Sequence, residues 1–166
     1  NMRLASGAAP ILKMLRYGVK VGLGVDGSAS NDGSHMLGEV RQAMLLSRLA
    51  SGLEGASLSS EDASPLMTAR QALRVATRGS AEVLGRSDIG SLEVGKCGDF
   101  FAVDMGQLNF SGALHDPLAA LVFCAPVNAD FTVVGGKFIV KEGHLQTIDL
   151  EPHIEKHNER ARRLLK

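Results

Sequence analysis

The segment that most constrains the fold is the apolar run VKVGLGV, residues 19–25, which leads directly into Asp26. Valine and leucine alternate there with Lys20 and two glycines, a pattern typical of a strand that packs closely against its neighbours. Apolar residues recur at helical spacing before it, over residues 9–17, and after it, over residues 37–49. A strand between two helices predicts an α/β fold, with Asp26 at the carboxyl end of the strand.

The helical segments carry their own end signals. Gly52 follows the last apolar residue of the long helix and is predicted to end it. Thr68 and Gln71 have the spacing of a capping box at the start of another helix. Ser80 is predicted to cap a further short helix that ends at Gly85.

The hydrophobic period changes after residue 89, where short apolar segments alternate with glycine turns. Residues 100–103 are predicted to form a strand, and FTVVGGKFIV, residues 131–140, has the signature of a β-hairpin around two glycines. Residues 118–123 are predicted to form a helix that starts near Asp116. The charged segment 151–166 is predicted to form an amphipathic helix.

Gly22, Gly24 and Gly27 form a G-x-G-x-x-G pattern, which also occurs in dinucleotide-binding turns. That function requires a helix to open at the third glycine and an acidic residue to end a strand about 20 residues later. Residues 28–33 are loop formers, and residues 41–49 have helical spacing. The context therefore argues against a nucleotide site.

Two interpretations of Asp26 remain open on local pattern alone. A carboxylate at the carboxyl end of a strand, followed by a polar loop, lies where catalytic groups collect in α/β proteins. Asp26-Gly27 is equally typical of a turn in which the carboxylate binds backbone amides.

Composition narrows the class of partner. The 18 Lys and Arg residues balance 18 Asp and Glu residues, so no overall field favours nucleic acid or an anionic membrane. Cys97 and Cys124 have neither zinc-binding nor disulfide spacing, and no apolar run reaches membrane-spanning length. These features predict a cytoplasmic protein that acts on a small molecule.

Three stretches resemble a known family: NMRLASG, GLGVDGSASNDG and LGEVRQAMLL, with further likeness in IGSLEVGKCGDFFAVD and VVGGKFIVKEGHL. They are similar to the metal-dependent amidohydrolases, in the branch of chlorohydrolases and deaminases, and most of all to 8-oxoguanine deaminases. The resemblance implies the last βα units of a (β/α)8 barrel over residues 1–86. It implies a β-rich, sandwich-like domain over residues 87–148 and a C-terminal helix over residues 149–166.

The resemblance also implies site residues. Asp26 matches the aspartate that binds the metal, Zn²⁺ or another divalent ion, and shares in proton transfer. Ser30 matches a serine that contacts substrate in related deaminases, although it could simply stabilise a turn. Asp32 and His35 match no ligand and are expected to cap backbone groups. The implied reaction is hydrolytic deamination of a purine-like heterocycle by a metal-activated water.

The sequence departs from the family in what precedes Asp26. No H-x-H motif is present, no histidine precedes Asp26, and a complete barrel takes about 250 residues. We therefore expect a C-terminal part of a longer enzyme, inactive alone, whose partners are the N-terminal part of the barrel and a heterocyclic substrate, with homo-oligomerisation left open. The alternatives are an s-triazine chlorohydrolase or aminohydrolase, and a non-catalytic assembly module.

Overall fold

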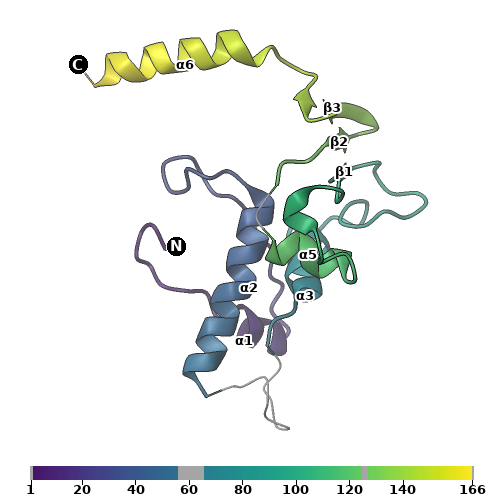
Figure 1. Ribbon diagram of the computed structural model, residues 1–166. Helices are drawn as coiled ribbons and strands as arrows, with labels where there is room; N and C mark the ends of the chain where they lie inside the picture. The colour runs from purple at the N-terminus through teal and green to yellow at the C-terminus, as the bar shows by residue number, and fades with distance from the viewer. Residues whose placement is uncertain (1, 56–65, 125–126, 166) are drawn as a thin grey trace. The chain divides into compact units, whose positions relative to one another are not determined.

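The structure is a computed structural model that describes residues 2–55, 66–124 and 127–165 (Figure 1). Its contacts divide the chain into two compact units. One contains Asn1–Lys96 and Met105–Val127, and the other contains Cys97–Asp104 and Asn128–Lys166. Each unit is described by itself below. The domain boundaries at residues 86 and 148 stay a prediction.

The first unit is built from helices. They are α1 (Ile11–Arg16), α2 (Met36–Leu53), α3 (Ala69–Arg74), the π-helix η1 (Val75–Gly79), α4 (Ser80–Val83), the 3-10 helix η2 (Leu108–Phe110) and α5 (Pro117–Phe123). Helix α2 packs against α3 and α5 (Figure 1). Because the α3, η1 and α4 segments follow one another without a break, they form one continuous helical stretch.

The core of this unit lies where α2 meets the helices around it. Val40 and Met44 of α2 are 1% and 0% exposed, and Met67, Val75 and Val122 are buried in the same cluster. Two residues of the predicted apolar series, Val40 and Met44, are thus in the core, whereas Leu45 and Leu49 of the same series are exposed.

The predicted strand at residues 19–25 is wrong as a statement about the described residues, because this segment forms no strand there. A strand needs a hydrogen-bonded neighbour, and the described chain places none beside these residues. Val21 and Leu23 instead pack against the helical core. The apolar pattern thus corresponds to a segment that is partly buried at Val21 and Leu23 but is not paired with a neighbouring strand.

The helix ends agree with the sequence in part. The capping box is confirmed: the Gln71 amide donates to Thr68 Oγ1 at 3.1 Å, and the Thr68 amide donates to Gln71 Oε1 at 2.8 Å. Gly52 does not end α2, which continues to Leu53, because one glycine costs a helix only about 1 kcal/mol. The left-handed backbone follows at Gly55, where φ is +89°.

Ser80 is not a cap, which corrects another prediction. It is the first residue of α4, but the π-helix η1 runs directly into α4. The backbone amides at this point are therefore inside a continuous helix and do not need a cap. The predicted end at Gly85 is confirmed by its left-handed φ of +68°. The predicted helix after Asp116 is also confirmed, with the Asp116 carboxylate accepting the Ala119 amide at 3.0 Å.

The second unit is a small antiparallel sheet followed by a helix. Its strands pair in sequence order: β1 (Phe100–Ala102), β2 (Phe131–Val134), β3 (Lys137–Lys141) and β4 (His144–Leu145). The hairpin between β2 and β3 is confirmed, and Gly135 and Gly136 both have the positive φ that its tight turn requires (+56° and +76°).

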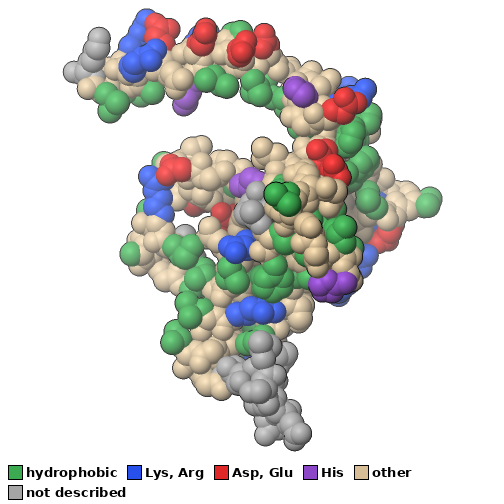
Figure 2. Space-filling view, viewed as in Figure 1, with side chains coloured by type: hydrophobic (Ala, Val, Ile, Leu, Met, Phe, Trp, Pro, Cys, Tyr) green, Lys and Arg blue, Asp and Glu red, His purple; other side chains and the backbone are tan. Residues whose placement is uncertain are grey.

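The last helix, α6 (Leu150–Leu164), confirms the prediction of an amphipathic helix. Acidic and basic side chains lie along one face and hydrophobic side chains along the other (Figure 2). Leu150, Ile154 and Leu164 are all exposed. Within the described ranges, no helix combines the length and apolar character needed to cross a membrane.

Candidate active site

Asp26 lies at the edge of a cleft of about 620 Å³ in the first unit. The extended segment 21–26 forms one wall of the cleft, Glu39 and Gln42 of α2 contribute to another, and Met2 and Arg3 also line it. Asp26 is exposed, and its φ of +62° is left-handed. That conformation is uncommon outside glycine, although Asp and Asn adopt it more readily than other residues.

The Asp26 carboxylate is held ionised by its own turn. The Gly27 amide donates to Asp26 Oδ1 at 2.8 Å. This hydrogen bond, helped by the Ser30 hydroxyl, holds the pKa of Asp26 below its ordinary value. The interpretation of Asp26-Gly27 as a turn is therefore confirmed. A role as a ligand is compatible with it, because the carboxylate stays anionic and accessible.

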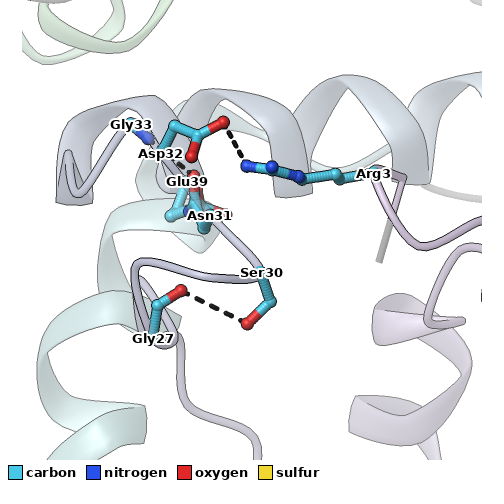
Figure 3. A network of polar contacts seen from close by, with 7 residues as sticks. All are labelled: Arg3, Gly27, Ser30, Asn31, Asp32, Gly33 and Glu39. Atoms are coloured by element: carbon cyan, nitrogen blue, oxygen red, sulfur yellow. Dashed lines mark hydrogen bonds and ion pairs between the residues drawn. The ribbon is translucent and has the colours of Figure 1, made fainter. Parts of the chain in front are cut away.

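Ser30 lies on the same turn. Its hydroxyl donates to the Gly27 carbonyl at 3.2 Å, and its amide donates to the same oxygen at 2.9 Å (Figure 3). The side chain thus stabilises the loop that follows Asp26. A contact between Ser30 and substrate stays a prediction.

The rest of the loop is tied to its surroundings by polar contacts (Figure 3). Asn31 Nδ2 donates to Glu39 Oε1 at 2.7 Å, which connects the loop to α2. Asp32 forms an ion pair with Arg3, and this guanidinium holds the pKa of Asp32 below its ordinary value. The expectation that Asp32 caps the backbone is therefore wrong, because the carboxylate faces a cation 29 residues away in the sequence.

His35 behaves as expected. It is the N-cap of α2, where its Nδ1 accepts the Gly38 amide at 3.1 Å, so in this arrangement Nδ1 is not free to bind a metal. Sequence reasoning did not anticipate the contact between Arg3 and Asp32. No local signal would have revealed it, since the two residues belong to separate loops.

The described residues can supply one ligand of a divalent metal site. Asp26 offers an ionised, exposed carboxylate, which is a suitable ligand for Zn²⁺. In the part of the chain that the structure describes, no group of three or more His, Cys, Asp and Glu side chains converges. Because a catalytic zinc site uses about three protein ligands, Asp26 would need partners from other segments.

Comparison with known proteins identifies the class to which the chain belongs. The model of the amidohydrolase family matches residues 1–139, and the chain belongs to this family. It is 46% identical over 165 residues to an 8-oxoguanine deaminase from Pseudomonas aeruginosa, and the match covers 99% of this chain and 34% of that protein.

Two solved structures are similar in fold. Atrazine chlorohydrolase from Arthrobacter aurescens, complexed with zinc, matches with a TM-score of 0.83 and 36% identity, over 95% of this chain and 33% of that one. An adenosine deaminase from Xanthomonas campestris with bound zinc matches with a TM-score of 0.86 and 30% identity, over 98% of this chain and 35% of that one. The chain thus spans about a third of the length of its relatives.

Proposed function

We propose that these residues form the C-terminal part of a longer metal-dependent amidohydrolase that deaminates a purine-like heterocycle of the 8-oxoguanine type. The observation that carries the proposal is the 46% identity to an 8-oxoguanine deaminase over 99% of the chain. In this reaction water adds to a ring carbon and the exocyclic C–N bond breaks. The carbon is left as a carbonyl, and ammonia is released.

Asp26 is the residue that would act on the reacting groups. Its ionised carboxylate would bind the metal, a role that the lowered pKa favours because the free group carries its charge at neutral pH. The same carboxylate would accept a proton from the attacking water. A bound Zn²⁺ would supply Lewis acidity, which makes water a stronger acid. Ser30 follows Asp26 by four residues, and its hydroxyl would contact a polar group of the substrate.

The proposal also gives residues 19–25 a place in the fold. They would be the last strand of a (β/α)8 barrel, paired with strands outside the described residues. Active sites of such barrels lie at the carboxyl ends of the strands, which is where Asp26 stands relative to this segment. The absence of pairing within the described chain follows naturally from this arrangement.

The test is ammonia release from 8-oxoguanine by the zinc-loaded full-length protein, compared with its Asp26→Asn variant. Asn is preferred to Ala because it tolerates the left-handed backbone at this position and keeps the size of the side chain. We expect the rate to fall at least about a hundredfold, the lower range for loss of a general acid or base. The matched control is Asp32→Asn, which alters a carboxylate on the same loop that pairs with Arg3.

A full rate in Asp26→Asn would remove Asp26 from the chemistry, and no ammonia from the unaltered protein would remove the deaminase assignment. An s-triazine hydrolase is the second candidate, favoured by the structural likeness to atrazine chlorohydrolase. It is also favoured by 41% identity over 139 residues to hydroxydechloroatrazine ethylaminohydrolase from Pseudomonas sp.. Release of chloride or an alkylamine from a triazine, without ammonia from 8-oxoguanine, would select it.

The 166-residue chain alone is expected to be inactive in the same assay. A single carboxylate among the described residues cannot complete a zinc site. If the isolated chain formed a stable, metal-free assembly of defined size, and the full-length protein also showed no hydrolysis, the assembly module would be the better description.

A further inference from the structure

The extended segment that leads to Asp26 lies with its backbone directly against the junction of η1 and α4. A Cβ atom added at Gly22 would stand 2.8 Å from Ser80 Cα. A Cβ atom added at Gly79 would stand 2.3 Å from the Val21 carbonyl oxygen. Real Cβ atoms do not approach other atoms so closely, so two glycines, one on each side, permit this contact.

The Ser80 side chain adds hydrogen bonds at the same place. Its Oγ accepts the Leu23 amide at 3.1 Å and also lies 3.3 Å from the Leu23 carbonyl oxygen. The Val75 carbonyl oxygen, also at 3.3 Å, competes for the single hydroxyl hydrogen. The two contacts with Leu23 are partly buried and join residues 57 positions apart, so they fix the extended segment to the helix.

The π-helical geometry of η1 belongs to this arrangement. Single π-helical turns inside helices often occur at functional sites, because the wider turn changes which side chains and carbonyls face a neighbour. Here η1 ends at Gly79, the residue that the Val21 carbonyl touches, and Ser80 follows directly. The helix is thus altered where it meets the segment.

We propose that Gly79 and Ser80 are positioning residues that hold Asp26 at the edge of the cleft. Only Gly24 and Val25 separate the anchored Leu23 from Asp26, so a shift of the anchor would move the carboxylate. The inference rests on the proposed function, in which Asp26 binds the metal. Residues that orient a metal ligand typically change metal affinity about 10- to 100-fold when replaced, without touching the metal.

The first test replaces Ser80 by Ala in the full-length protein. The matched control is Thr77→Val. It removes a nearby hydroxyl, in η1, that donates to the Leu73 carbonyl and makes no bond to the extended segment. We expect Ser80→Ala to weaken zinc binding about tenfold, measured by competition with a chelator, while Thr77→Val leaves it unchanged. We also expect kcat per zinc-bound enzyme to fall while KM stays constant. Loss of folded protein would only reduce the amount of zinc-bound enzyme and would leave this kcat unchanged.

The second test replaces Gly79 by Ala, with Gly52→Ala as its control. Gly52 also lies in a helix, but a Cβ atom there would meet nothing within 4 Å. Gly79→Ala must displace the Val21 carbonyl, and a displacement near 1 Å can cost about a hundredfold in rate. If this variant does not fold, the Ser80→Ala comparison still decides the proposal.

Hydrogen exchange tests the contact between Ser80 and Leu23 independently of the reaction. In Ser80→Ala, peptides that contain Leu23 should exchange faster than in Thr77→Val, with or without zinc. Faster exchange with unchanged zinc affinity would overturn the positioning role, and so would unchanged exchange. If the unaltered protein released no ammonia, the proposed function would fail. Hydrogen exchange and zinc affinity would still test whether Ser80 positions Asp26 through Leu23.

Discussion

Replacement of Met44 by Ala should remove more stability than any change on the exposed side of the same helix. Met44 is 0% exposed and lies in the cluster where α2 meets Met67 and Val122. Truncation of a buried methionine to alanine costs about 2–5 kcal/mol, because buried apolar surface is lost and a cavity remains. We expect a value of about 3 kcal/mol, since full burial is partly offset by the flexible neighbour Met67, which can shift into the space.

The assay is urea unfolding of the full-length protein, followed by circular dichroism at a helical wavelength. Leu49→Ala on the same helix is the matched control: its side chain is 59% exposed, so we expect a change below about 0.5 kcal/mol. Met44→Leu, which nearly conserves volume, should cost less than about 1.5 kcal/mol. Equal losses for Met44→Ala and Leu49→Ala would refute the description of α2 as the centre of this core.

Three further changes test other features. Thr68→Ala removes the capping box and should lower the free energy of unfolding by about 1 kcal/mol, measured in the same way. Gly136→Ala places a Cβ in a left-handed turn and should cost about 1 kcal/mol, seen as a lower melting temperature, whereas an unchanged value would contradict the turn geometry. Ser30→Ala removes one cause of the lowered pKa of Asp26, so the carboxylate should protonate at higher pH in a carbon-13 NMR titration. The stability that the lowered pKa provides is present above the unfolded-state pKa and is lost as pH falls through the folded-state value. The variant leaves the unfolded-state pKa unchanged, so this loss should end at a higher pH and be smaller in total.

Features that depend on nearby residues could be predicted from the sequence. The capping box of Thr68 and Gln71 and the hairpin turn at Gly135 are decided within a few residues, because the groups that form them are neighbours along the chain. Both of these predictions are confirmed. The apolar spacing of α2 indicates the buried Val40 and Met44 for the same reason, but Leu45 and Leu49 of the same series are exposed.

Features that depend on distant residues could not be predicted in this way. The alternation in residues 19–25 predicts a strand, but a strand exists only with a hydrogen-bonded partner, and the described residues provide none. Ser80 has the residue type of a cap, yet its hydroxyl bonds to Leu23, and nothing near either residue signals this contact. At the candidate site, the position of Asp26 at the end of an apolar segment was accessible from the sequence, whereas the link between Arg3 and Asp32 was not.

The left-handed backbone at Asp26 has a consequence for how variants of this protein would behave. Glycine adopts such a conformation without steric cost, so Asp26→Gly should relax local strain even as it deletes the carboxylate. If Asp26 performs the chemistry proposed above, selection for turnover would keep the acid, while relief of the backbone strain would favour glycine. The two effects would then act in opposite directions at a single residue.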